Sequence, residues 1–324
     1  MCIRDSGTIA RLEDANRVPM GVVTVNPASK IICRMLDQDP DAVIDQAWFT
    51  ARLARALAHR ARLYADPFYR LVHAEADGLP GIIIDRFGDL AVIQPNAAWA
   101  DMLIEPLVAA LQDVTGVTTV IMNGTGRART LEGLEEKTEI LVGKAPDGPV
   151  PVPMNGAIYM ADVMGGQKTG LFFDQRPNHA FAASLSKGAR VLDMFSHVGG
   201  FGLAALAADA ASVLAVDGSA PALELAEQGA AAMNVSDRFV TRKGDAFDVL
   251  TALAEEGETF DVVVCDPPAF APSKPTLEAG LRAYERIARL AAPLVADGGY
   301  LILCSCSHAA DLTRFRNCLL YTSD

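Results

Sequence analysis

The stretch Arg190–Asp217 constrains the fold more than any other part of this chain. Residues 191–195 form a short apolar run that ends in a turn containing Ser196, Gly199, Gly200 and Gly202. Small apolar residues at 203–208 then predict a helix, and residues 213–216 predict a second buried strand. A strand that leads through a glycine-rich turn into a helix begins a βαβ unit. Nucleotide-like ligands bind at that turn in open parallel sheets.

The chain beyond residue 154 continues this alternation. The further predicted helices and strands lie, in chain order, at 219–233, 238–242, 247–256, 260–265, 276–296 and 299–304. Strands that alternate with helices form a parallel sheet with right-handed crossovers. We therefore expect a doubly wound, Rossmann-like α/β domain in which the loops after the strands share one edge of the sheet.

Smaller units precede this domain. Residues 8–36 predict short strands, residues 47–64 an amphipathic helix and residues 68–142 a small α/β unit, followed by a Gly/Pro-rich linker at 143–153. Within the small α/β unit, residues 98–114 predict a helix and residues 124–137 a polar loop. We expect four segments: a β-rich remnant at 1–38, a linker helix within 39–66, a central α/β domain at 67–145 and the doubly wound domain at 146–317. The terminal sequences MCIRDS and CLLYTSD resemble translated sequencing adapters. We therefore expect a fragment cut at both ends, with residues 1–6 and 318–324 as artefacts.

The charge and cysteine content limit the function classes. With 28 basic and 40 acidic residues the net charge is −12, which argues against non-specific coating of nucleic acid but allows a local basic channel. No apolar run approaches the roughly 18 residues of a membrane span. The six cysteines are scattered and form no CxxC pair, so we expect no metal site, no disulfide framework and a cytoplasmic location.

The glycine-rich turn favours S-adenosylmethionine over a dinucleotide. It lacks the early glycine of GxGxxG, which lets a pyrophosphate approach the backbone. In its form D-x-F-x-x-x-G-G, Asp193 can accept a hydrogen bond from the amino group of S-adenosylmethionine. Asp217 lies where a carboxylate binds ribose hydroxyls, with Gly218 beside it. Asp245, followed by Ala246, lies where a carboxylate binds adenine, although an Asp before a helix is equally a cap.

Two residues at the ends of neighbouring strands predict the reaction. Asp266 follows an apolar strand and precedes two prolines, which hold the backbone extended over the cofactor methyl. Cys306 follows the next strand, about 4.8 Å away in a parallel sheet. This pair suits methylation at C5 of a pyrimidine, in which a thiolate adds to C6 while the carboxylate binds the base edge. Ala269 stands where amino-group methyltransferases have an aromatic residue, which disfavours amino methylation.

Other polar and aromatic residues have two readings. We count Lys168, Arg176, Pro267 and Phe270 as substrate contacts, and the two cations could instead cap the cofactor pocket. His197 and His308 lie near the site, where a lone histidine is more often structural. We interpret Cys265 and Cys304 as core residues. The arginines between 52 and 62 could follow a phosphate backbone or cover a solvated helix face.

These motifs together resemble a known family. GQKTGLFFDQR, VLDMFSHVGGFG, AVDGS, FDVVVCDPPAF and LILCSCS, in this order and spacing, are similar to the class I methyltransferases that form 5-methylcytosine in large-subunit (23S) ribosomal RNA. ADGLPGIIIDRFGD resembles the family's central domain, and VNPASKIICRML the end of its PUA domain. The resemblance covers nearly all of residues 8–317, and it implies that two further C-terminal strands of the catalytic sheet are missing.

The resemblance implies roles for single residues. Phe195, Ser196 and Gly199 would line S-adenosylmethionine, and Cys306 would be the nucleophile. His197 departs from the family, which commonly has an aromatic residue there. The alternatives that remain are another RNA nucleotide as the target, a dinucleotide-dependent oxidoreductase and a catalytically idle RNA-binding protein. The oligomeric state is also open, with a homodimer among the alternatives.

Overall fold

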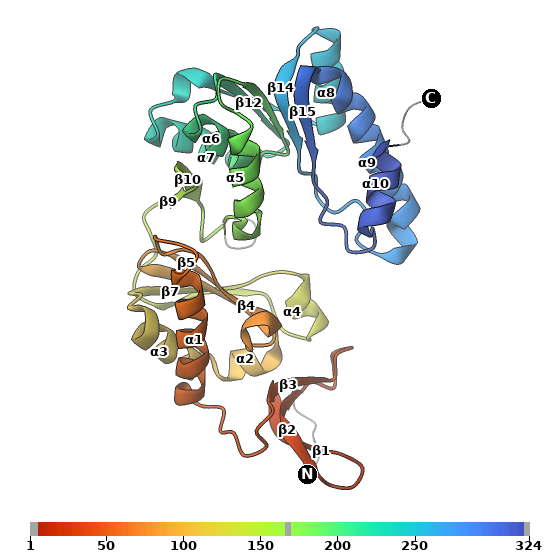
Figure 1. Ribbon diagram of the computed structural model, residues 1–324. Helices are drawn as coiled ribbons and strands as arrows, with labels where there is room; N and C mark the ends of the chain where they lie inside the picture. The colour runs from red at the N-terminus through yellow and green to blue at the C-terminus, as the bar shows by residue number, and fades with distance from the viewer. Residues whose placement is uncertain (1–5, 166–169, 321–324) are drawn as a thin grey trace. The chain divides into compact units, whose positions relative to one another are not determined.

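The strands of the computed structural model, which describes residues 6–165 and 170–320, form four sheets within that part of the chain (Figure 1). The chain divides into two units. The first comprises Met1–Val150 and Asp162–Phe173, and the second comprises Pro151–Ala161 and Asp174–Asp324. The segment 151–161 therefore belongs with the C-terminal part of the chain.

The first unit contains two sheets. The antiparallel sheet of order β1-β2-β3 consists of β1 (Thr8–Glu13), β2 (Pro19–Val25) and β3 (Cys33–Asp37). The mixed sheet of order β4-β5-β6-β7-β8 consists of β4 (Phe68–His73), β5 (Ile82–Phe87), β6 (Leu90–Pro95), β7 (Thr119–Gly124) and β8 (Lys137–Val142). Its pairs are antiparallel except for β6 and β7.

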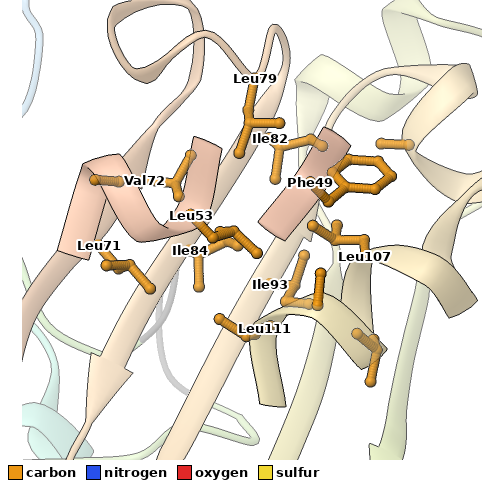
Figure 2. Close-up of a cluster of buried hydrophobic side chains, with 14 of the residues drawn as sticks. Phe49, Leu53, Leu71, Val72, Leu79, Ile82, Ile84, Ile93, Leu107 and Leu111 are labelled. Atoms are coloured by element: carbon orange, nitrogen blue, oxygen red, sulfur yellow. The ribbon is translucent and has the colours of Figure 1, made fainter. Parts of the chain in front are cut away.

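Helices cover the mixed sheet and close its core. They are α1 (Gln46–Ala61), α2 (Ala98–Met102), α3 (Ile104–Thr115) and α4 (Arg127–Leu131). The apolar face of α1 places Phe49 and Leu53 against Ile84, and Leu107 and Leu111 of α3 complete the cluster (Figure 2). The α1 helix, expected as a linker, contributes fully buried side chains to this core.

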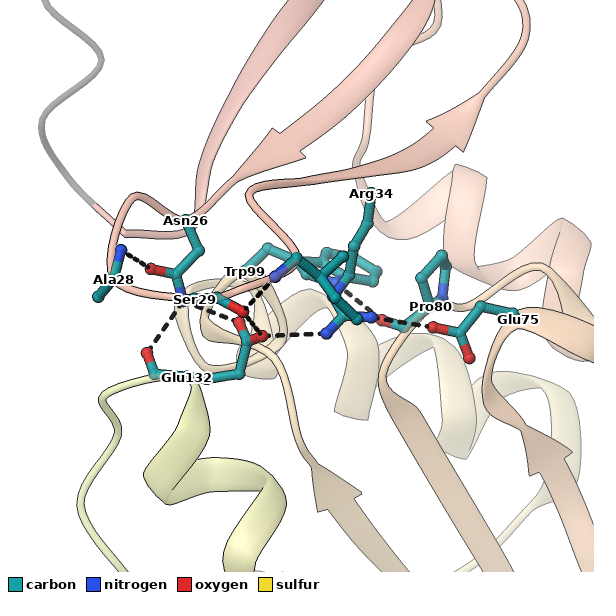
Figure 3. A network of polar contacts seen from close by, with 9 residues as sticks. Asn26, Ala28, Ser29, Arg34, Glu75, Pro80, Trp99 and Glu132 are labelled. Atoms are coloured by element: carbon teal, nitrogen blue, oxygen red, sulfur yellow. Dashed lines mark hydrogen bonds and ion pairs between the residues drawn. The ribbon is translucent and has the colours of Figure 1, made fainter. Parts of the chain in front are cut away.

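A buried carboxylate joins the small sheet to the segment after α4 (Figure 3). Glu132 accepts hydrogen bonds from Asn26 Nδ2 at 2.8 Å and from Ser29 Oγ at 2.7 Å. It also forms an ion pair with Arg34 at 3.0 Å. Burial raises the pKa of Glu132, but these three partners outweigh burial and the net pKa is lowered. The network fixes the β1–β3 sheet to the rest of the first unit.

The second unit is built on a parallel sheet of order β13-β12-β11-β14-β15. Its elements are, in chain order, α5 (Arg176–Ser184), β11 (Arg190–Met194), α6 (Gly200–Ala207), β12 (Ser212–Asp217), α7 (Ala220–Ala232), β13 (Phe239–Lys243), α8 (Ala246–Glu255), β14 (Phe260–Cys265), α9 (Leu277–Ala291), β15 (Val295–Leu303) and α10 (Leu312–Leu320). The expected doubly wound sheet is confirmed, and β14 and β15 are neighbours as predicted.

Helices pack on both faces of this sheet. Leu192, Met194 and Val263 face α8 and α9, where they share a core with Leu250 and Ile287. Since neighbouring residues of a strand point to opposite faces, Val191 and Asp193 point toward the other side, where α6 and α7 pack. A carboxylate on this apolar face is unusual, and it belongs to the site described below.

Three local features differ from the sequence expectation. The expected linker at 143–153 ends in β9 (Val150–Met154), which pairs with β10 (Ala157–Ala161) as a separate two-stranded sheet. Two prolines in this segment argue against a strand in a sequence-based prediction. The short sheet tolerates them because both of its strands are edge strands. The expected helix at 98–114 is broken at Leu103. The expected polar loop after β7 contains α4, which buries Arg129 through hydrogen bonds to Asp101.

None of the helices within the described part of the chain has both the length and the apolar character needed to cross a lipid bilayer.

Candidate active site

The turn after β11 has an unusual backbone. Phe195, His197 and Gly199 all have positive φ angles, of 62°, 50° and 80°. Side chains larger than glycine rarely adopt this conformation, and the strain persists only where the surroundings enforce it. Here the Ser196 N–H donates to Val216 O at 3.0 Å, and the Ser196 carbonyl accepts from Gly199 N at 2.8 Å. Strain of this kind is concentrated at ligand sites.

Two glycines of α6 allow the backbone to approach its neighbours closely. A Cβ atom on Gly200 would lie 2.8 Å from Nε2 of His179. A Cβ atom on Gly202 would lie 2.7 Å from Cγ1 of Val213. Without side chains at these positions, the start of α6 lies directly against His179 at Gly200 and against β12 at Gly202, and the N–H of Gly202 reaches Asp193 of β11.

Asp193 is a fully buried carboxylate with one oxygen unused. Its Oδ2 accepts from Gly202 N at 2.8 Å, while Oδ1 makes no hydrogen bond with any described residue. Burial raises the pKa of Asp193 to about 7, the N–H of Gly202 acts in the opposite direction, and repulsion from Asp266 adds to the rise. Ser196 Oγ is also buried without a partner in the described chain. Two unpartnered buried oxygens at one turn fit a ligand that brings hydrogen-bond donors, such as an amino group.

Asp217 connects two loops at the end of β12. Its Oδ2 accepts from His197 N at 2.9 Å, and its Oδ1 accepts from Ser219 N at 2.8 Å. Each carboxylate oxygen has a second lone pair, so Asp217 can still accept from two ligand hydroxyls. The space beside Gly218 is open, because the nearest atom to a Cβ there would be Gly244 O at 4.0 Å. These features are compatible with a ribose bound at this position.

Asp245 is the N-cap of α8. Its Oδ1 accepts from Phe247 N at 2.9 Å and Asp248 N at 3.4 Å, so the capping interpretation is confirmed. Both bonds go to Oδ1, and the described residues give Oδ2 no hydrogen bond, which leaves this oxygen for an adenine amino group. Ala246, the next residue, is buried at the start of the helix.

Asp266 follows β14 and is half-buried. Its Oδ2 accepts from Gln175 Nε2 at 2.9 Å, and Gln175 Oε1 in turn accepts from Asn178 Nδ2 at 2.6 Å. The backbone N–H of Asp266 donates to Met194 O at 3.3 Å, which joins it to the end of β11. Asp266 therefore lies at the same sheet edge as Asp193 and has a fixed orientation.

The three cysteines near the sheet differ in exposure. Cys265 is fully buried, as predicted, and burial raises the pKa of its thiol. Cys304 is only half-buried, so the prediction of a core residue is wrong: its thiol is a hydrogen-bond partner of Asp266. Burial first, and the nearby Asp266 second, raise the pKa of Cys304 to about 12. Cys306 is exposed, and its Sγ lies 3.9 Å from the carbonyl oxygen of Pro267. The accessible thiol thus lies beside the loop that carries the carboxylate.

The remaining predicted residues have varied surroundings. Pro267 is buried, and the Phe270 ring packs between other aromatic rings, 5.0 Å from Tyr284. Arg176 opens α5 and donates to Asn155 Oδ1 at 3.3 Å. His308 is exposed, and Lys168 lies outside the described residues.

The arginines of α1 bind within the first unit. Arg52 forms an ion pair with Asp37 at 2.7 Å and lies over the Trp48 ring. Arg60 forms an ion pair with Asp77 at 2.6 Å. These two guanidinium groups hold α1 to its neighbours, which favours the structural interpretation of the arginine row.

Two further residues at this edge were not predicted from sequence. Gln175 lies in the motif GLFFDQR directly before Arg176, so the motif itself was the available signal. Tyr284 lies on α9, between the motif that ends at Phe270 and the motif that begins at Leu301, and no local pattern marked it. Its contacts with the serines beside Cys306 depend on the packing of the helix.

Comparison with known proteins shows which sequences this chain is similar to. The sequence profile of a family described as S-adenosylmethionine-dependent methyltransferase matches residues 135–314. The chain is 40% identical over 284 residues to ribosomal RNA large subunit methyltransferase I of Shewanella amazonensis, which covers 86% of this chain and 72% of that protein. A protein of the same name from Yersinia pseudotuberculosis is 34% identical over 322 residues, covering 97% of this chain and 80% of that protein.

Solved structures have the same fold. A Streptococcus mutans protein described as an S-adenosylmethionine-dependent methyltransferase matches with a TM-score of 0.81 and 18% identity, over 98% of this chain and 82% of that chain. A methyltransferase solved with S-adenosylhomocysteine matches with a TM-score of 0.82 and 19% identity, over 98% of this chain and 82% of that chain. At these identities the likeness shows the fold alone.

Proposed function

This chain belongs to the S-adenosylmethionine-dependent methyltransferase family, and on that premise we propose that it methylates C5 of a cytosine in large-subunit ribosomal RNA. The names of its relatives support the RNA substrate. The observation that carries the C5 chemistry is the exposed thiol of Cys306 beside the Asp266–Pro267 loop. S-Adenosylmethionine is the cofactor, and ribosomal RNA as the substrate favours a cytoplasmic location.

The chain's own residues fit this cofactor. The unpartnered Oδ1 of Asp193 and Oγ of Ser196 would hold its amino and carboxylate groups at the strained turn. The free lone pairs of Asp217 would hold the ribose hydroxyls, and Oδ2 of Asp245 would hold the adenine amino group. When bound there, the cofactor supplies an electrophilic methyl group on sulfur.

The residues at the ends of β14 and β15 would activate the base. The Cys306 thiolate adds to C6 of the cytosine, forming an S–C bond and moving the C5–C6 electron pair toward C5. Carbon 5 then has the nucleophilicity needed to accept the methyl group. Loss of the C5 proton to a base and cleavage of the S–C6 bond restore the aromatic ring and the thiolate. The base must leave its stack for this reaction.

Asp266 and Cys304 would have supporting roles. The Asp266 carboxylate accepts hydrogen bonds from the cytosine edge, and Gln175 keeps it oriented for this contact. Because the pKa of Cys304 is raised to about 12, its sulfur stays protonated at neutral pH and can donate to Asp266. Cys304 is therefore the weaker candidate for the nucleophile.

We also propose that residues 1–38 belong to a PUA-like domain, followed by the segments 39–66, 67–145 and 146–317. The antiparallel sheet β1–β3 supports the β-rich character of the first segment.

Trapping on modified RNA tests the reaction. RNA containing 5-fluorocytosine cannot lose its C5 substituent, so a cysteine adduct accumulates after methyl transfer. The wild-type chain should form this adduct in the presence of S-adenosylmethionine, Cys304→Ala should retain it and Cys306→Ala should lose it. An adduct that survives in Cys306→Ala would overturn the role of Cys306. Methylated RNA with no adduct in the wild type would indicate another nucleotide or atom as the target.

A further inference from the structure

We propose that Tyr284 is a positioning residue, which holds the Cys306 thiol at a fixed place and direction relative to Asp266. This inference rests on the proposed role of Cys306 as the nucleophile. Tyr284 lies on α9 and is 2% exposed. It would act through the two serines that flank the cysteine.

The Tyr284 hydroxyl bonds both of these serines. Its oxygen lies 2.7 Å from Ser307 Oγ and accepts from Ser305 Oγ at 3.0 Å. The backbone N–H of Ser307 also donates to Ser305 Oγ at 3.3 Å, which closes a small ring of hydrogen bonds. A phenol hydroxyl has one proton and two lone pairs, so Tyr284 can accept from Ser305 and donate to Ser307 at the same time.

This ring fixes the direction of Cys306. Ser307 is buried at 6% exposure, while Cys306 is exposed and its Sγ lies 3.9 Å from the carbonyl oxygen of Pro267. Since Ser305 and Ser307 both bond Tyr284, the chain on each side of Cys306 is held to α9, while the thiol itself lies beside the loop after β14. The two serine contacts therefore set the orientation of the thiol without touching sulfur.

The same tyrosine also anchors the loop that carries the carboxylate. Ser307 Oγ accepts from Ala271 N at 2.8 Å, and the Tyr284 ring lies 5.0 Å from the Phe270 ring. A Cβ on Gly280, one turn earlier on α9, would lie 2.7 Å from the Phe270 carbonyl carbon. The helix backbone thus lies directly against this loop. Tyr284 joins the loops after β14 and β15, so it controls the separation between the carboxylate and the thiol.

The substitution Tyr284→Phe removes only the hydroxyl. The ring contacts with Phe270 and Phe315 remain possible, so the core of the helix is kept. The matched control is Tyr300→Phe, because Tyr300 lies on β15 of the same sheet and is 51% exposed. The full chain is used for both variants.

Three measurements separate positioning from folding and from cofactor binding. Tyr284→Phe should slow adduct formation on 5-fluorocytosine RNA by about ten-fold or more, since small displacements of a reacting group cost rate steeply. The affinity for S-adenosylhomocysteine, measured by calorimetry, should stay within about two-fold of wild type because Tyr284 is not at the cofactor turn. Alkylation of Cys306 by iodoacetamide should also stay within about two-fold, since a small reagent can approach from many directions. Tyr300→Phe should match wild type in all three.

A mutant cycle tests the route through the serines. Ser305→Ala should slow adduct formation in the wild-type background but cause little further slowing in Tyr284→Phe, because both changes remove the same contact. Equal adduct rates in Tyr284→Phe and wild type would overturn the positioning role. A wild-type chain that forms no adduct, although it binds S-adenosylhomocysteine, would instead overturn the proposed reaction. A large rise in Cys306 alkylation in Tyr284→Phe would show that the residue only maintains the fold.

Discussion

Gln175 Nε2 donates a 2.9 Å hydrogen bond to Asp266 Oδ2, so a residue directly before α5 orients the carboxylate that follows β14. Asn178 holds the other end of the same amide through Gln175 Oε1 at 2.6 Å. Both the nitrogen and the oxygen of the Gln175 amide are therefore hydrogen-bonded, and the amide cannot rotate without breaking one of these hydrogen bonds. Asp266 thus receives a neutral hydrogen-bond donor from Gln175.

Replacement of Gln175 should impair catalysis more than folding. Gln175→Glu places a second carboxylate against Asp266, and we expect methyl transfer to slow by about ten-fold or more because like charges at this distance repel. The control is Gln228→Glu, which adds the same charge at an exposed position of α7. The initial rate of methyl transfer from labelled S-adenosylmethionine checks this. Equal rates in the two variants would mean that Gln175 does not orient Asp266.

Asp193 should make the stability of the cofactor-free chain depend on pH. Burial raises the pKa of Asp193 from 3.8, its ordinary value, to about 7 in the folded chain. Between these two pH values the folded chain therefore holds a proton on Asp193 that the unfolded chain has lost. Stability should therefore fall as pH rises from about 4 to 7, by up to about 4 kcal/mol. Asp193→Asn should remove this slope and be the more stable protein at pH 8. Thermal unfolding between pH 5 and 8 measures the effect, with Asp237→Asn on the surface as control.

The same substitution should weaken cofactor binding. If Asp193 accepts a hydrogen bond from the amino group of the cofactor, Asp193→Asn should lower the affinity for S-adenosylhomocysteine by about a hundred-fold, because a buried charged partner is lost. Stabilisation of the wild-type chain by this ligand should be larger at pH 8 than at pH 5, because the carboxylate is ionised at the higher pH. If Asp193→Asn is more stable and still binds S-adenosylhomocysteine with wild-type affinity, Asp193 does not contact the cofactor.

Gly202 should tolerate a methyl group only if its neighbour becomes smaller. The Cβ of Gly202→Ala would lie 2.7 Å from Cγ1 of Val213, so we expect a loss of about 1–3 kcal/mol in the free energy of unfolding. Adding Val213→Ala should recover part of this loss. Gly148→Ala is the control, because no atom lies within 4 Å of the added Cβ. Chemical denaturation gives these free energies, and the absence of any recovery would show that another contact limits the site.

Cys304 and Cys306 should react differently with pH. With a pKa of about 12, Cys304 has a thiolate fraction of only about one in ten thousand at pH 8. Iodoacetamide should therefore modify Cys306 first at pH 8, and labelling of Cys304 should rise toward pH 11. Peptide mass spectrometry after timed alkylation distinguishes the two sites. Faster labelling of Cys304 at pH 8 would reverse the assignment of the nucleophile.

The catalytic sheet could be predicted from sequence because its signals are local. The apolar run at 191–195, the glycine turn and the carboxylate at Asp217 lie within one βαβ unit, and the apolar strand before Asp266 is equally distinct. The predicted strand neighbours followed from the handedness of the crossovers. Local pattern and topology were therefore sufficient to bring Asp266 and the loop of Cys306 to one edge of the sheet.

The rest depended on contacts between distant segments. Burial of Cys304 was overestimated because β15 is the outermost strand of the sheet within the described chain, so an apolar run there is only half covered. The hydroxyl of Tyr284 meets Ser307 across 23 residues of sequence, which no periodicity encodes. The positive φ angles of Phe195 and His197 were not predictable either, since their residue types disfavour that conformation.

The absence of a side chain at Gly280 lets helix α9 pack directly against the loop that follows Asp266. Helix α9 lies against the backbone of the loop at Phe270, with no flexible side chain between them that could compress. If an RNA base binds beside Cys306, as proposed, the loop at Phe270 should yield little to it, because this loop is packed directly against α9. We expect the nucleic acid strand to supply the deformation that the encounter requires, so unpaired or weakly stacked cytosines should be the easier targets.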